Sequence, residues 1–261
     1  MEFGIYLEFG AWCSEFVWDL YLGYWLFIKS IFNLKPMYIK IIKLETVDST
    51  NNYASMLAEK GAREITFVTS KTQVKGKGRL GKYWASPLNK GIYASFVLRP
   101  ACSLHDMYYL PLVFSLAAAR LLETYFKEKK YISHDGQIKI KLPNDVLLCG
   151  KKVAGILVEA KITGKKINFV IVGIGVNINA LKAELPPKAT SLYLITGRKH
   201  HLEDVSKNLI KEVMRVYNEF KKGNIKQIVE AALMYQRTKS MNIAKEDLLK
   251  EVKEKEAVHL L

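Results

Sequence analysis

The sequence predicts an α+β fold, a largely antiparallel mixed sheet with helices packed on one side. Short runs rich in β-branched and aromatic residues follow one another between residues 137 and 177, with only brief turns between them. Residues 108–127 and the segment from residue 203 onward instead have apolar residues at helical spacing. Adjacent strands joined by short turns pair antiparallel, and long helices grouped elsewhere in the chain cover the sheet. A chain of 261 residues is long enough to bury such a core.

The expected elements can be placed in chain order from local composition. Strands are predicted at residues 38–44, 65–69, 91–98, 137–142, 146–148, 153–161 and 167–177. Helices are predicted at residues 51–60, 108–127 and from 203 onward. The first helix follows Asp48, Ser49 and Thr50, whose short oxygen-bearing side chains suit a helix start. Gly150 and residues 163–166 are expected to form turns between strands.

Residues 1–37 differ in composition from the rest of the chain. They contain three of the four tryptophans and no cation before Lys29. Their longest uncharged run is far shorter than the ~20 residues of a spanning helix, and a secretory signal needs a basic start. We therefore expect an aromatic-rich appendage at residues 1–37, with Met37 as an alternative start, a main domain at 38–234 and a shortened region at 235–261.

The charge and the cysteine content of the chain indicate what it can bind and in which compartment it works. The formal net charge is +15, but the lysines are spread along the chain, which is typical of a solvated surface as well as of an anion-binding protein. Three scattered cysteines and five histidines show neither a disulfide framework nor metal-ligand spacing. A reducing, cytoplasmic location without stable membrane insertion is the expected setting.

Residues 70–84 contain a basic glycine-rich segment with the pattern G-x-G-x-x-G. A dinucleotide-binding turn needs a helix directly after the glycines, whereas this segment runs into Trp84, Ala85, Ser86 and Pro87. The remaining readings are a flexible loop that closes over a phosphate group and a basic surface loop without a ligand.

Five blocks of sequence then resemble the biotin protein ligase family. They are residues 47–51 (VDSTN), the Gly-Lys-Gly-Arg loop at 76–79, residues 141–146 (KLPNDV), residues 150–159 (GKKVAGILVE) and residues 172–179 (VGIGVNIN). The order and separations of the blocks match that family over residues 40–235. The form it resembles lacks an N-terminal DNA-binding domain, so no DNA binding is expected.

The resemblance implies a fold and a reaction. The fold is the core shared by biotin and lipoate protein ligases and similar to class II aminoacyl-tRNA synthetases, here as a catalytic domain at residues 38–234. The activity is an ATP-dependent ligase that makes biotinyl-5′-AMP, releases pyrophosphate, and transfers biotin to a lysine of a biotin carboxyl carrier protein domain. Biotin and ATP are then substrates, with Mg²⁺ present, the partner is a biotin-dependent carboxylase such as acetyl-CoA carboxylase, and a homodimer is possible.

The resemblance also implies which residues bind biotin. Hydroxyl and amide groups suit a ureido ring, which has both donors and an acceptor. The expected set is Ser49, Thr50, Asn51, Gln73, Gly76, Lys77, Gly78, Arg79, Lys152 and Gly155. For Ser49 and Thr50 a plain helix-capping role is the alternative, and the two roles can coexist.

A second set is implied for ATP and the adenylate. It comprises Lys77, Arg79, Trp84, Asn144, Lys152 and Asn177. Lys152, Arg79 and Asp145 are the expected catalytic residues, with Lys152 meeting the biotin carboxylate or the adenylate phosphate. Asp145 is expected in a loop, where it holds Mg²⁺, orients the incoming lysine amine, or only caps a turn.

The sequence departs from the family pattern at three places, and two other functions are alternatives. Lys77 stands where the family usually has arginine, so the charge is kept and the planar fork is lost. Leu142 replaces a common tryptophan, and residues 241–261 do not predict the usual small C-terminal β-domain. Lipoate–protein ligase is the nearest alternative function, and a non-enzymatic basic nucleic-acid-binding module is a remote one.

Overall fold

The structure, a computed structural model, describes residues 39–127 and 138–236. It contains one seven-stranded sheet in the order β1-β2-β3-β7-β6-β5-β4. The strands are β1 (Lys40–Val47), β2 (Thr66–Gln73), β3 (Gly91–Leu98), β4 (Ile138–Lys141), β5 (Asp145–Leu148), β6 (Lys151–Thr163) and β7 (Lys166–Asn177). The helices are α2 (Thr50–Glu59), α3 (Leu104–Met107), α4 (Leu110–Lys127), α5 (Leu192–Thr196), α6 (Leu202–Lys221) and α7 (Ile225–Met234). Two 3-10 turns, η1 (Arg79–Gly81) and η2 (Lys182–Glu184), complete the set.

The sheet is antiparallel except at one edge. Strands β1 and β2 are parallel and are joined through α2, and every other neighbouring pair is antiparallel. Strands β6 and β7 form a long hairpin in which Gly155 pairs with Gly175. The α+β prediction with a largely antiparallel mixed sheet is therefore confirmed.

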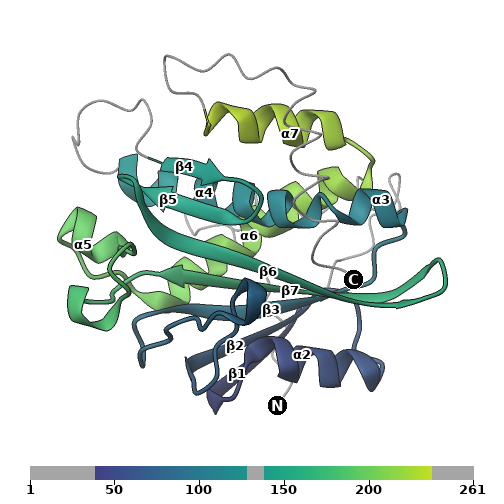
Figure 1. Cartoon of the computed structure of the whole chain (residues 1–261), viewed down its shortest axis with the longest axis horizontal. Coiled ribbons are helices and arrows are strands. Elements are labelled where there is room, and N and C mark those ends of the chain that lie inside the picture. Colours follow the sequence, from purple (N-terminus) through teal and green to yellow (C-terminus); the bar gives the residue numbers. More distant parts are fainter. Residues whose placement is uncertain (1–38, 128–137, 237–261) are drawn as a thin grey trace, which may run out of the picture.

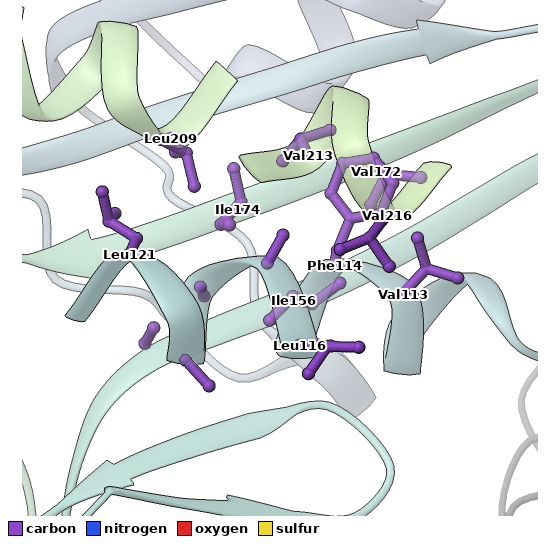
Figure 2. Packing of buried hydrophobic residues seen from close by; sticks show 14 of the residues in the cluster. Val113, Phe114, Leu116, Leu121, Ile156, Val172, Ile174, Leu209, Val213 and Val216 are labelled. Carbon is purple, nitrogen blue, oxygen red and sulfur yellow. The ribbon is translucent and has the colours of Figure 1, made fainter. Parts of the chain in front are cut away.

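The main core lies between the sheet and the long helices (Figure 1). Figure 2 shows Phe114 of α4 and Val213 of α6 converging on Val172 and Ile174 of β7. These four side chains are almost wholly buried. The apolar spacing that predicted the helices therefore reflects real burial on this face of the sheet.

The other face of the sheet carries α2. Side chains alternate along a strand, so Phe96 of β3 belongs to the main core while Val97 packs with Ala54 and Ala58 of α2. The predicted packing of helices on one side holds for α4, α6 and α7, and α2 is the helix on the opposite face. Next to the N-terminal end of α2, the same face bears the pocket described below.

Most predicted element boundaries agree with the structure within a few residues, and β3 agrees fully. Strand β1 continues to Val47 and β2 continues to Gln73, beyond the apolar runs that predicted them. Pairing in the parallel register holds these polar ends in the sheet. The short elements α3, α5, η1 and η2 were not predicted, because a single turn leaves too little periodicity to detect.

Some predictions fall outside the described residues. The predicted appendage at residues 1–37 and nearly all of the predicted shortened region at 235–261 lie outside the described residues. Within residues 39–127 and 138–236, no helix has the length and apolar character needed to cross a membrane.

Candidate active site

The pocket lies on the α2 face of the sheet. It encloses about 440 Å³ of empty space, part of which is open to solvent. Its walls come from the start of α2, the end of β2, the glycine-rich segment, and the middle of β6 and β7. Segments from residue 49 to residue 175 of the chain therefore meet at one site.

One end of the pocket is a buried polar floor. The Thr50 backbone N–H and hydroxyl both donate to Gln73 Oε1, at 2.8 and 3.0 Å. Gln73 Nε2 in turn donates to the Ser86 hydroxyl at 2.9 Å. Ser49 occupies the N-cap position of α2, but its side chain makes no capping bond. The capping role considered for Ser49 is therefore absent, and Gln73 satisfies the first N–H of the helix instead.

The floor continues through Ser95 of β3, which sequence analysis did not single out. Ser95 Oγ lies 2.8 Å from Thr50 Oγ1 and 2.6 Å from Asn51 Oδ1, so both oxygens are within reach of its single hydrogen. Asn51 Nδ2 then donates to Glu159 Oε2 at 2.7 Å. Thr50, Asn51, Gln73 and Ser95 are all at least nine-tenths buried, so their hydrogen bonds are costly to leave unmade.

Glycines on β6 and β7 form the bed of the pocket. A Cβ added at Gly175 would lie 2.3 Å from Trp84 Cε2, and one at Gly155 would lie 2.8 Å from Trp84 Cζ3. A Cβ at Gly173 would lie within 2.2 Å of Asn51 Oδ1. The bare strands thus let the Trp84 indole and the Asn51 amide approach the backbone closely. Trp84 Nε1 is buried without a hydrogen-bond partner, so it is a donor that a bound acceptor can satisfy.

Lys152, the second residue of β6, lines the pocket. Its Nζ lies 2.6 Å from Asp145 Oδ1 and 5.2 Å from the centre of the Trp84 ring. The two contacts hold the side chain between the Asp145 carboxylate and the face of the indole. The neighbouring Lys151 is exposed, as expected from alternation along a strand. Asp145 is the first residue of β5 and not a loop residue as predicted, because it pairs with Gly155 across the hairpin.

The glycine-rich segment, which was predicted as a loop, forms a small hairpin. Gly78 N donates to Lys82 O at 2.7 Å, and Trp84 N donates to Gly76 O at 2.9 Å. Leu80 and Gly81 turn the chain with φ of 57° and 68°. These backbone bonds hold the charged segment in a defined shape. No α-helix follows the glycines before β3, which agrees with the exclusion of a dinucleotide-binding turn.

The hairpin brings its cations to the rim of the pocket. Lys77 Nζ lies 3.3 Å from Glu159 Oε1, and Arg79 Nη1 donates to Asn144 Oδ1 at 2.8 Å. Asn144 Nδ2 donates to the Ile156 carbonyl at 2.8 Å. A larger hollow of about 1,710 Å³, open to solvent, adjoins the pocket on the other side of the hairpin. Lys77, Arg79 and Asn144 line both spaces.

Most residues predicted for the site meet at the pocket. Those that line it are Ser49, Thr50, Asn51, Gln73, Lys77, Gly78, Arg79, Trp84, Asn144, Lys152 and Gly155. Gly76 lines the adjoining hollow, and Asp145 contacts the site through Lys152. Asn177 is not among the lining residues, and its Nδ2 donates to the Thr190 carbonyl at 3.0 Å.

Sequence analysis missed four contributors, namely Ser95, Glu159, Gly173 and Gly175. The two glycines carried a detectable signal, since two glycines spaced by two in an apolar strand leave one face bare. Ser95 sits in the uniformly apolar strand β3, and only the sheet register places it opposite Gly173. Glu159 stands in a quoted motif but gave no reason to separate it from other surface acids.

The described residues offer limited ligands for a divalent metal. They contain no group of three histidine, cysteine or acidic side chains that could hold one. Asp145 supplies a single carboxylate, already paired with Lys152. That set fits Mg²⁺ held mainly by substrate phosphates and water, as is usual for this ion with nucleotides.

Comparisons with known proteins agree with this geometry. Residues 44–177 match the model of the biotin/lipoate A/B protein ligase family. The chain is 34% identical over 163 residues to the bifunctional ligase/repressor BirA of Bacillus spizizenii, covering 61% of this chain and 48% of that protein. It is 34% identical over 168 residues to the biotin–[acetyl-CoA-carboxylase] ligase of Paracoccus denitrificans, covering 62% and 65%. The chain thus spans about half to two thirds of the length of these relatives.

A solved structure is also similar. The biotin protein ligase of Aquifex aeolicus in complex with biotin and ATP superposes with a TM-score of 0.61 at 32% identity. The match covers 76% of this chain and 78% of that one. The family model covers just over half of the present chain and includes the polar floor, the hairpin and the glycine bed. The chain therefore belongs to the biotin/lipoate A/B protein ligase family.

Proposed function

We propose that this protein is a biotin protein ligase. It condenses biotin with ATP to give biotinyl-5′-AMP and pyrophosphate, then transfers the biotinyl group to a lysine of a biotin carboxyl carrier protein domain. The observation that carries the proposal is the pairing of two features in one pocket. A buried polar floor lies at one end and a cluster of cations, Lys77, Arg79 and Lys152, lies at the rim.

The polar floor suits the ureido ring of biotin. Thr50 and Gln73 present hydroxyl and amide groups in a water-poor recess, and the buried Ser95 contacts Thr50 beside them. A ligand that lacks matching polar groups leaves these side chains unpaired, which a buried site rejects strongly. The dithiolane ring of lipoate has no N–H or carbonyl group. This favours biotin over lipoate, although the family includes ligases for both acids.

The cations suit the first half-reaction. A biotin carboxylate oxygen attacks the α-phosphorus of ATP, a bond to phosphorus forms, and the bond to the pyrophosphate oxygen breaks. Both reactants are anionic, so fixed positive charge is needed where they meet. Lys152 is held beside the glycine bed by Asp145 and Trp84, and Arg79 is held by Asn144. Mg²⁺, when bound, supplies further charge neutralisation on the phosphate oxygens.

The second half-reaction needs no covalent enzyme intermediate. The carrier lysine, as a free amine, attacks the carbonyl carbon of biotinyl-5′-AMP, and AMP leaves with the electrons of the acyl–oxygen bond. A carboxylate near that carbonyl can orient the amine and accept its proton. Asp145 meets this requirement once Lys152 turns to the adenylate phosphate, because the two side chains are in contact before the reaction. The solvent-open hollow beside the hairpin leaves room for a carrier lysine to approach.

Exchange of labelled pyrophosphate into ATP tests the proposal. The protein is incubated with ATP, Mg²⁺ and either biotin or lipoate. Exchange that depends on biotin supports the proposed function. Exchange with lipoate alone assigns the protein to the other branch of its family, and folded protein without exchange with either acid contradicts adenylation.

A further inference from the structure

We infer that Glu159 is a specificity-determining, positioning residue that fixes the orientation of the Asn51 amide and, through it, the direction of the Ser95 hydroxyl hydrogen. It makes the floor an acceptor for a ligand with N–H groups. The inference rests on the proposed function and deepens it, because it concerns how the same pocket selects a cyclic urea.

The argument begins with a group that can only accept. An ionised carboxylate has no hydrogen to donate, so the 2.7 Å contact between Glu159 Oε2 and Asn51 requires the Asn51 NH₂ group to face Glu159. The amide of Asn51 then has one possible orientation, with Oδ1 toward Ser95. Asn51 is 3% exposed, so water does not compete for either end of this amide.

The direction passes on to the hydroxyls. Because Asn51 Oδ1 can only accept, Ser95 must direct its single hydrogen to Asn51, the shorter contact at 2.6 Å, and not to the Thr50 hydroxyl 2.8 Å away. The Thr50 hydroxyl donates its own hydrogen to Gln73 Oε1, which can only accept. Gln73 is fixed in that orientation by the Thr50 backbone N–H, which can only donate.

Neither hydroxyl has a hydrogen left for a ligand. Thr50 lines the pocket and can still offer lone pairs, so the ligand group that meets its hydroxyl must carry an N–H or O–H donor, whereas Ser95 is fully buried and acts through Thr50 and Asn51. Cyclic ureas and lactams meet this condition, and a dithiolane does not. Glu159 itself is part-exposed and lines the adjoining hollow, not the pocket, so it reaches the pocket floor through Asn51.

Glu159 also pairs with Lys77 at 3.3 Å, and the test must separate the two contacts. Both side chains of that ion pair are 42% exposed, and ion pairs this exposed contribute little. The Asn51 contact is shorter and lies deeper. We therefore expect the effect of Glu159 on biotin binding to come through Asn51.

Glu159→Gln is the informative change. It keeps the size of the side chain and a hydrogen bond to Asn51, but an amide can donate as well as accept. Asn51 can then turn over and donate to Ser95, and Ser95 can turn its hydrogen to Thr50, where it occupies a lone pair that faces the pocket. We expect biotin to bind about 5- to 20-fold more weakly in calorimetric titration without ATP, an effect on the scale of one hydrogen bond.

A compensating change restores the direction. In the double variant Asn51→Asp, Glu159→Gln, the carboxylate is at position 51 and the amide is at position 159. The new carboxylate at position 51 can only accept, so Ser95 must donate again, while the amide at position 159 donates to it. We expect biotin affinity to recover at least threefold over Glu159→Gln. Asn51→Asp alone sets two carboxylates against each other and should be the weakest binder of the three.

The outcomes separate the inference from the proposed function. Glu45→Gln is the matched control, since Glu45 pairs with Lys71 at 2.7 Å on the surface, and it should bind biotin like the parent. Additive losses in the double variant, or Glu159→Gln binding biotin like the parent, overturn the inference alone. A parent protein that binds lipoate and not biotin, or neither, overturns the proposed function and the ligand class together.

Discussion

Replacing Gly175 by alanine tests whether the glycine bed positions Trp84 for catalysis. A Cβ at this position would lie 2.3 Å from Trp84 Cε2 and 2.5 Å from its Nε1. Ordinary carbon contacts are about 3.5–4.0 Å, so the indole must rise by roughly 1 Å or more. The ring is part-exposed and its Nε1 has no partner, so it can lift without losing a hydrogen bond.

The two consequences differ in size. We expect a stability cost near the low end of the overpacking range, about 1 kcal/mol, because the ring has somewhere to go. The lifted ring moves into the space above the bed and changes its position relative to Lys152, now 5.2 Å from its centre. Displacements of about 1 Å in a reacting group can reduce rates by roughly 100-fold. We therefore expect kcat/KM for biotin-dependent pyrophosphate exchange to fall by about that factor.

Gly164→Ala is the matched control. Gly164 lies in the β6–β7 turn with φ of 58° and has no atom near its missing Cβ. Alanine there costs about 1–2 kcal/mol through backbone strain and leaves the pocket untouched. Thermal melting should show similar losses for both variants, whereas only Gly175→Ala should lose activity. Equal activity in the two variants would refute a positioning role for the bed.

Three further predictions concern single side chains. Lys152→Ala should abolish measurable pyrophosphate exchange because it removes the cation that Asp145 and Trp84 hold, and exchange at the parental rate would contradict its assignment. Burial, with a smaller contribution from Asp106, raises the pKa of Cys102 to about 11, so iodoacetamide at pH 8 should alkylate it roughly 100-fold more slowly than in unfolded protein, as read by mass spectrometry. The hydrogen bond from Asn52 lowers the pKa of Asp48, so Asn52→Ala should raise that pKa in an NMR titration. The ionised Asp48 stabilises the fold above its ordinary pKa, and this contribution is lost as the pH falls through the lowered value. The stability of the variant should therefore depend less on pH in that range.

The sheet and its long helices could be predicted because their signals are local. Alternating or continuous apolar runs marked β3, β6 and β7, and helical spacing marked α4 and α6. The ends of β1 and β2 could not be predicted, because Val47 and Gln73 are held in the sheet by each other and not by their own composition. The side of the sheet that α2 covers is likewise a consequence of tertiary packing.

The site divides in the same way. Motif residues such as Thr50, Gln73 and Lys152 were identifiable because a family resemblance marks them individually. Their partners were not, since each hydrogen bond joins residues far apart in the chain, for example Asn51 with Glu159 and Ser95 with Thr50. The hairpin shape of the glycine-rich segment could not be predicted for a related reason. Its bonds between Gly78 and Lys82 depend on turn geometry at Leu80 and Gly81 that composition alone does not specify.

The lysine at position 77, where the family pattern has arginine, fits the hydrogen-bond chain of the floor. Glu159 divides its two oxygens, giving Oε1 to Lys77 and Oε2 to Asn51. A lysine ammonium is a compact charge that needs only one of them, whereas the planar guanidinium of arginine is shaped to bind both oxygens of a carboxylate at once. An arginine drawn to Glu159 would therefore compete with Asn51 for Oε2, and Asn51 is the residue through which Glu159 orients Ser95. The departure at Lys77 thus leaves one carboxylate able to serve the rim and the floor together.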